Sequence, residues 1–201
     1  MSVARGDTLT GKFHLTNSGG EPLDVRSFVI GGEGRAGEYL SSQRVRIEGL
    51  APKQHVSHPI GTLIPSDMPK GFWAMGAEVR SGNGKIGAAL VSFEVVDPFD
   101  AVLRLPNSPI KAGTKEVTIL VNLKNNSRKV LWGSAKITLP VGWEIWKNRD
   151  TQQFGVPGGG GQTSVRFVAK PPLGHLGDVP VQVAIKTGKG SKTLEGTISI
   201  M

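Results

Sequence analysis

The sequence predicts an all-β protein of two consecutive Ig-like β-sandwich domains, with about seven strands in each. Three observations predict this fold. Most apolar runs alternate with polar residues at period two, as strands with one buried face do. Glycine (28 residues) and proline (13 residues) are abundant and interrupt these runs within about ten residues. The two halves of the 201-residue chain also share an internal repeat.

The alternating positions define a candidate core for each half. Each buried aliphatic or aromatic side chain contributes about 1.5 to 3 kcal/mol, so either set is large enough for an independent core. In the first half the candidates are Leu9, Phe13, Leu15, Val25, Phe28, Ile30, Trp73, Met75, Ala77, Val79, Val91, Phe93 and Val95. In the second half they are Val117, Ile119, Val121, Leu123, Ile137, Leu139, Val165, Phe167, Val179, Val181, Val183, Ile185, Ile198 and Ile200.

The repeat places the domain boundary at Asp97-Pro98. Pro65 and Gly71 match Pro171 and Gly177 at an offset of 106, and the glycine turns at 82–84 and 188–190 share that offset. Earlier in each copy, residues 15–19 match residues 123–127 at an offset of 108. Proline ends a strand and restricts the residue before it. We therefore expect domains at residues 1–97 and 98–201.

The first domain has an opening strand that is short or missing. Residues 101–105 supply a strand's worth of chain before Gly113, whereas Val3 is the one large aliphatic residue between Met1 and Gly6. An open sheet edge invites pairing with another chain. Either the chain is cut from a longer polypeptide, or a partner donates the strand.

Charge and composition limit the function classes. Residues 1–97 carry 10 basic and 10 acidic side chains, whereas residues 98–201 carry 14 and 6, so the second domain holds all of the net charge of +8. Its basic residues are dispersed and lack a nucleic-acid motif, so we expect a solvated surface and no nucleic-acid partner.

The absence of cysteine excludes disulfides, cysteine-ligated zinc and thiol nucleophiles. No stretch is apolar and long enough to span a membrane, and we expect any export signal to lie outside the given chain.

One strand of the second domain resembles a known family. Ile137-Thr138-Leu139-Pro140-Val141-Gly142-Trp143-Glu144-Ile145 is similar to the leucine, proline, any residue, glycine, tryptophan strand of the NPCBM-associated modules beside alpha-galactosidase catalytic domains. The order of glycines, Asn-Ser-Gly and alternating strands also resembles bacterial cell-adhesion-related Ig-like and fibronectin type III-like modules. The first domain departs from the Leu-Pro-x-Gly-Trp pattern. The resemblance implies a non-catalytic module of secreted or surface proteins and no specific ligand.

Neither a catalytic nor a metal site is predicted. His55 and His58 are three residues apart, which on a strand directs their side chains to opposite faces. No serine sits in a Gly-x-Ser-x-Gly elbow, and the glycine run at 158–161 lacks the Lys-Ser/Thr and helix of a phosphate loop, so it predicts a flexible loop. We expect no cofactor and no enzyme activity, unless part of a composite site lies on another chain.

Aromatic and basic residues are the candidate ligand or partner contacts. Exposed indoles form platforms for sugar rings or partner proteins. Tryptophan on a central strand more often packs between the sheets, which we expect for Trp73 and Trp143. The candidates are Trp132, Trp146, Lys147, Arg149 and Tyr39.

The leading hypothesis is a spacer or subunit-contact module of a larger extracytoplasmic or surface assembly. Its partner would be another protein, or adjacent domains of the same polypeptide. The alternative is a carbohydrate-binding accessory module of a secreted glycoside hydrolase, which would use Trp132 and Trp146.

Overall fold

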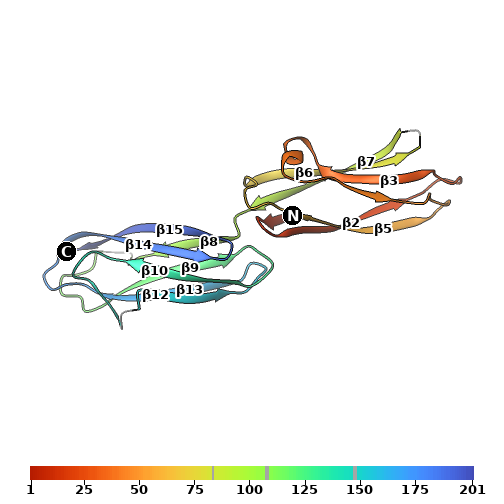
Figure 1. Ribbon diagram of the computed structural model, residues 1–201. Coiled ribbons are helices and arrows are strands. Elements are labelled where there is room, and N and C mark those ends of the chain that lie inside the picture. Colours follow the sequence, from red (N-terminus) through yellow and green to blue (C-terminus); the bar gives the residue numbers. More distant parts are fainter. Residues whose placement is uncertain (83, 107–108, 147–148) are drawn as a thin grey trace. The chain divides into compact units, whose positions relative to one another are not determined.

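A computed structural model describes residues 1–82, 84–106, 109–146 and 149–201. Contacts divide the chain into two compact units, Met1–Asp97 (unit 1) and Pro98–Met201 (unit 2). Each unit is built from strands arranged in two sheets (Figure 1). The prediction of an all-β fold with two consecutive sandwiches is confirmed.

Unit 1 contains a five-stranded sheet and a two-stranded sheet. The larger sheet has the order β1-β7-β6-β3-β4, and the smaller one pairs β2 with β5. Figure 1 shows β2 and β5 forming one layer, with β3, β6 and β7 in the other. The strands are β1 (Ser2–Ala4), β2 (Thr8–Thr16), β3 (Val25–Gly32), β4 (Gln43–Arg46), β5 (His55–Leu63), β6 (Gly71–Ser81) and β7 (Gly84–Val96), with a short 3₁₀ helix at Gly34–Glu38.

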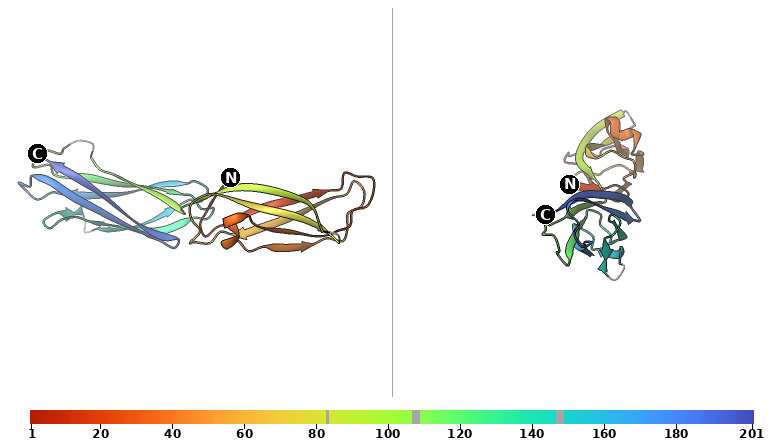
Figure 2. Two further views of the ribbon diagram at one scale, coloured as in Figure 1. Left: turned by 90° about the horizontal axis from the view of Figure 1, so that it is seen from above. Right: turned by 90° about the vertical axis from the view of Figure 1, so that its left-hand side faces the viewer.

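Unit 2 contains two four-stranded sheets. Their orders are β12-β10-β14-β15 and β11-β13-β9-β8. Both views in Figure 2 show β14 and β15, coloured blue, running side by side. The strands are β8 (Phe99–Arg104), β9 (Val117–Asn125), β10 (Leu131–Thr138), β11 (Glu144–Ile145), β12 (Thr151–Val156), β13 (Gln162–Lys170), β14 (Gly177–Thr187) and β15 (Gly190–Ile200).

Each unit has its own hydrophobic core between its sheets. Phe28 and Phe93 lie at the centre of the unit 1 core, and Phe99 and Phe167 lie in that of unit 2. The alternation of the sequence produces these cores directly, because every second residue of a strand faces the opposing sheet. In β9 the alternation is complete, and Val117, Ile119, Val121 and Leu123 are all buried.

The repeated glycines close equivalent hairpins in the two units. Gly84 begins β7 with a φ of 121°, and Gly190 begins β15 with a φ of 136°. These positive angles disfavour any residue with a side chain. At the far end of each hairpin, Gly71 pairs with Val95 and Gly177 pairs with Ile200.

The opening strand of unit 1 is short but present. β1 pairs in parallel with β7, with Val3 opposite Val95. Unit 2 makes the equivalent contact as an isolated parallel bridge between Ile110 and Ile200. Val3 therefore corresponds to Ile110, which follows β8. Among the described residues, unit 1 has no strand that corresponds to β8 itself.

The glycine run at residues 158–161 forms a tightly bonded turn, which corrects the prediction of a flexible loop. The amides of Gly159 and Gly160 donate to the carbonyls of Ser127 and Asn125. A Cβ built on Gly158 would lie 2.0 Å from the carbonyl oxygen of Arg128. Glycine is required here because the turn packs directly against neighbouring backbone.

Within the described parts of the chain, no helix is long and apolar enough to cross a membrane.

Candidate interaction sites

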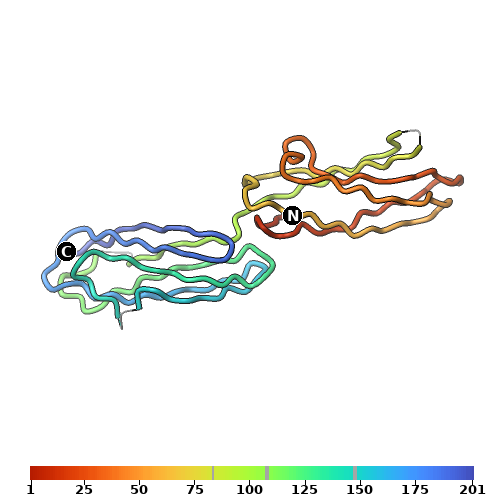
Figure 3. The backbone as a smooth tube through the Cα atoms, in the orientation of Figure 1, coloured from red at the N-terminus to blue at the C-terminus, as the bar shows by residue number. Residues whose placement is uncertain are grey.

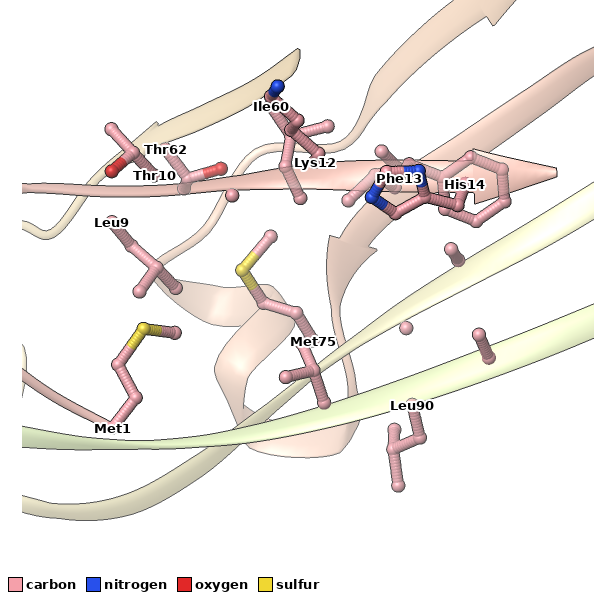
Figure 4. A pocket seen from close by; sticks show the side chains of 16 residues that line it. Met1, Leu9, Thr10, Lys12, Phe13, His14, Ile60, Thr62, Met75 and Leu90 are labelled. Atoms are coloured by element: carbon pink, nitrogen blue, oxygen red, sulfur yellow. The ribbon is translucent and has the colours of Figure 1, made fainter. Parts of the chain in front are cut away.

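An apolar groove of about 280 Å³ opens between the two sheets of unit 1, beside β2. Figure 4 shows Leu9 and Met75 pointing toward one another across it, with the side chain of Met1 beside Leu9. A cavity of about 150 Å³ admits one benzene ring, so this groove has room for more than one aliphatic side chain. Its apolar lining residues are Met1, Leu9, Phe13, Ile30, Ile60, Met75, Ala77, Ala89, Leu90 and Val91.

The groove exists because the inner face of β2 is incomplete. Leu9, Gly11 and Phe13 share this face, since side chains alternate along a strand. Leu9 is buried, whereas Gly11 contributes no side chain and is exposed. A Cβ built on Gly11 would meet only the side chain of Ile60, at 3.6 Å. The groove therefore stays open at Gly11.

The edge of β2 that faces away from β5 borders the groove. Among the described residues, no second strand pairs with β2 along this edge. β2 pairs antiparallel with β5 along its whole length, and within the described residues this sheet has two strands. In unit 2 the corresponding strand, β9, pairs with β13 on one side and β8 on the other. An unpaired edge offers backbone donors and acceptors to an added strand.

His55 and His58 point to opposite faces of β5, as predicted. His58 contacts the ring of Phe28 on the inner side, with centroids 5.6 Å apart. His55 stacks on His14 of β2, and Nδ1 of His14 lies 3.4 Å from Nε2 of His55. The sequence alone does not predict this pair, because it depends on the β2–β5 register. The described residues contain no cluster of three groups that could hold a metal.

Trp132 is a highly exposed aromatic residue in unit 2, with 71% of its surface accessible. It lies on the outer face of β10, opposite Gly155 of β12. A Cβ built on Gly155 would fall 2.5 Å from the six-membered ring of the indole, so the ring lies over the glycine backbone. Ser134 lies two residues after Trp132 on the same face of β10. It pairs with Gln153 of β12 on one side and with Lys186 of β14 on the other. The arrangement resembles a flat platform with polar groups beside it.

Trp146 lies in a different environment from Trp132. It is 53% exposed and lines a mixed hollow of about 330 Å³ with Arg149, Gln152, Arg166 and others. This hollow borders β13, which belongs to the other sheet of unit 2. Lys147 lies outside the described residues. Trp132 is not part of this lining, so the structure does not join the two tryptophans into one surface.

Tyr39 and Trp73 pack together against the core of unit 1. Their rings meet edge to face with centroids 5.6 Å apart, and both are partly buried against the hydrophobic cluster. The indole N–H of Trp73 donates to the carbonyl of Pro69 at 2.9 Å. The prediction that Trp73 belongs to the core is confirmed. Tyr39 is held in the same packing.

Trp143 also packs against the core, as predicted for the Leu-Pro-x-Gly-Trp strand. Gly142 precedes it with a φ of 92°, which a residue with a side chain rarely adopts. The indole meets the ring of His175 edge to face at 6.5 Å. The glycine and tryptophan of this motif therefore have a structural role at the end of the sandwich.

The basic residues of unit 2 are spread over both sheets. Lys124 and Arg166 lie on β9 and β13, whereas Lys136 and Lys186 lie on β10 and β14. All four are exposed. Dispersed charges of this kind keep a surface hydrated and do not form the stripe typical of nucleic-acid sites.

No protein-family model matches the sequence, and no curated protein matches it. Several solved structures align with it. A red sea bream transglutaminase is 12% identical over 99% of this chain and 30% of its own, with a TM-score of 0.42. Trypsin-activated alpha-2-macroglobulin from Escherichia coli is 14% identical over 99% of this chain and 17% of its own, with a TM-score of 0.44. A FixG-related protein from Vibrio parahaemolyticus is 11% identical over 52% of this chain and 98% of its own, with a TM-score of 0.41. The chain thus spans less than a third of the transglutaminase and of the macroglobulin.

Proposed function

We propose that the chain is a non-catalytic pair of Ig-like β-sandwiches that serves as a spacer or subunit-contact module in a larger extracytoplasmic assembly. The observation that carries this proposal is the open β2 edge over an apolar groove in unit 1. An apolar groove bordered by the open edge of a strand can serve as a contact surface for another polypeptide. The extracytoplasmic location rests on the resemblance of residues 137–145 to modules of secreted and surface proteins.

The junction between the units supports a spacer role. β7 ends at Val96 and β8 begins at Phe99, so two residues connect the sandwiches (Figure 3). Asp97 is tied to unit 1 by ion pairs with Arg5 and Lys70. The carbonyl of Pro98 accepts a hydrogen bond from the amide of Asn126 in unit 2. A junction this short limits the distance between two domains more than a flexible linker does.

Glu78 belongs to an ion-pair network on the surface of unit 1. The pKa of the Glu78 carboxyl is lowered by hydrogen bonds from Arg80 and then Lys85. Those three side chains form an exposed surface network at 2.8 and 3.0 Å. A catalytic carboxylate is instead tuned by burial in a cleft. This network is typical of a solvated β-sheet surface.

Site-specific photo-crosslinking in the source cells tests the proposal. A photoreactive residue at Lys12, on β2, should capture a single protein partner in the extracytoplasmic fraction. The same residue at Thr197, on the exposed face of β15, is the matched control. Capture at neither position, or residence of the chain in the cytoplasm, would exclude the contact role.

A second candidate function is carbohydrate binding on the Trp132 platform. The specific observation is the exposed indole lying over Gly155 beside Gln153 and Lys186. Aromatic faces on a flat sheet suit the apolar faces of sugar rings.

Affinity-gel electrophoresis with a panel of polysaccharides should show retardation that Trp132→Ala removes. Gly155→Ala should weaken it as well, because the new methyl group displaces the ring, whereas Trp146→Ala is the control. Unretarded migration in every polysaccharide would reject this function.

A further inference from the structure

Two histidines of unit 1 face each other across the ladder between β2 and β5. In this register His14 lies opposite Ser57, two residues from His55. The two imidazoles are therefore diagonal neighbours on the outer face of the sheet, where long and aromatic side chains can meet. Both side chains are exposed. The pair is distinct from the His55-x-x-His58 spacing of the sequence, because His58 points to the inner side of β5.

Each ring of the pair directs one nitrogen toward the other ring. Nδ1 of His14 is 3.4 Å from Nε2 of His55, whereas the two ring centres are 5.4 Å apart. The two nitrogens therefore lie between the ring centres, and the ring planes are within 22° of parallel. A nitrogen donor in a protein hydrogen bond usually lies about 2.7 to 3.2 Å from its acceptor. The separation of the pair is longer than this range.

The separation matches two ligands of one tetrahedral metal ion. Imidazole nitrogens bind Zn²⁺ at about 2.0 to 2.1 Å, and Zn²⁺ is most often four-coordinate and tetrahedral. Two nitrogens at these distances and at the tetrahedral angle lie about 3.3 to 3.4 Å apart. Neighbouring ligands of a square-planar or octahedral ion lie closer together, at about 2.9 Å. The two histidines thus have the spacing of one edge of a zinc tetrahedron.

Thr16 orients one of the two rings. Its Oγ1 atom lies 2.8 Å from Nδ1 of His55. When Nδ1 donates its hydrogen to this oxygen, Nε2 of the same ring carries the lone pair that a metal ion needs. Metal-binding histidines are commonly oriented by such a hydrogen bond from the second ring nitrogen. The contact with Thr16 therefore prepares His55 as a ligand on the side that faces His14.

The surroundings of the pair leave further coordination positions to water. Among the described residues, no third histidine, aspartate or glutamate joins the pair to form a larger metal-binding group. Lys12 precedes His14 by two residues on the same face, about 6.6 Å along the strand. Lys53 is directed elsewhere, because its Nζ donates to the carbonyl of Ser18 at 2.6 Å.

We propose that His14 and His55 together bind one Zn²⁺ ion. Nδ1 of His14 and Nε2 of His55 are the protein ligands, and water occupies the two remaining positions. Thr16 is a positioning residue that keeps Nε2 of His55 free of hydrogen. The bound ion links β2 to β5 on the outer face of unit 1. This site is separate from the apolar groove and does not depend on the proposed contact function.

Isothermal titration calorimetry of the untagged full chain with zinc chloride tests the site. One ion should bind per chain, whereas magnesium chloride should not bind, because Mg²⁺ prefers oxygen ligands. His14→Gln and His55→Gln should each weaken zinc binding at least tenfold. Both positions are exposed, so these variants should keep the melting temperature of the parent chain. His175→Gln is the matched control and should leave the affinity unchanged, since that ring lies beside Trp143 in unit 2.

Two further measurements test the roles of single atoms. Thr16→Val should weaken zinc binding about tenfold, and Thr16→Ser should restore it, because serine keeps the hydroxyl that accepts from His55. NMR spectra of the histidine ring nitrogens should show zinc shifting Nδ1 of His14 and Nε2 of His55. The ring signals of His58 and His175 should not move.

Four results would overturn the proposal. Absence of zinc binding would show that the two imidazoles form only a hydrogen-bonded pair. Binding that survives in the double variant His14→Gln/His55→Gln would place the ion elsewhere. One ion per two chains, with a zinc-dependent dimer in sedimentation velocity, would replace water by a second copy as the completing ligand. A zinc shift at Nε2 of His14 instead of Nδ1 would contradict the stated geometry.

Discussion

Asn17 and Asn125 make the same hydrogen bonds in the two units. The side-chain amide of Asn125 donates to the carbonyls of Lys129, Val156 and Pro157. That of Asn17 donates to the equivalent carbonyls of Glu21, Leu50 and Ala51. Each side-chain oxygen accepts the amide two residues later, from Ser127 or Gly19. The repeated asparagine thus joins two loops at the end of each sandwich.

Removing this anchor should destabilise unit 2 strongly. Asn125→Ala deletes a fully buried side chain and leaves carbonyls without their donor, which costs about 2 to 4 kcal/mol in total. Urea unfolding followed by tryptophan fluorescence measures the change. The exposed Gln182→Ala should change the free energy of unfolding by less than about 0.5 kcal/mol. An equally small effect at Asn125 would show that water replaces the anchor.

The glycine turn at 158–161 should not tolerate a side chain. Gly158→Ala places a methyl group against the backbone of Arg128, so we expect a loss of more than about 1 kcal/mol in the free energy of unfolding. Gly188→Ala is the control, since nothing lies within 4 Å of its Cβ position. Thermal unfolding of both variants compares them. Equal melting temperatures would mean that the turn shifts at little cost.

Two phenylalanines of unit 1 should differ widely in their contribution to stability. Phe28 is 1% exposed and Phe72 is 83% exposed. Phe28→Ala removes a core ring that stacks on Phe13, which should cost about 3 to 5 kcal/mol. Phe72→Ala should change stability by less than about 0.5 kcal/mol. Differential scanning calorimetry measures both, and a large loss in Phe72→Ala would indicate that its ring is covered in solution.

The Glu78 carboxyl should titrate below its ordinary pKa of 4.5. Hydrogen bonds from Arg80 and Lys85 favour the charged form. Because the folded-state pKa is lowered, the stabilisation is present above the unfolded pKa and is lost as the pH falls through the folded value. An NMR pH titration should show the midpoint moving up toward 4.5 in Arg80→Gln and in Lys85→Gln. An unchanged midpoint in both variants would contradict this cause.

The sequence by itself determined the secondary structure and the sandwich architecture. Alternation such as that from Val117 to Leu123 needs only local chain geometry, because successive residues of a strand face opposite sides. The positive φ angles of Gly84 and Gly190 are likewise local demands of a hairpin. The opposite orientations of His55 and His58 follow from the same period.

The tertiary structure alone decided which strands pair and which edges stay open. The comparison of the two copies predicts an open sheet edge in the first domain. It does not identify the strand at that edge, because the alternation of β2 is the same whether one or two strands lie beside it. The stacking of His14 on His55, the indole of Trp132 over Gly155 and the separation of Trp132 from Trp146 all depend on registers between distant segments. Register is set by packing of the whole sandwich, because each strand has several sterically equivalent partners until the core is assembled.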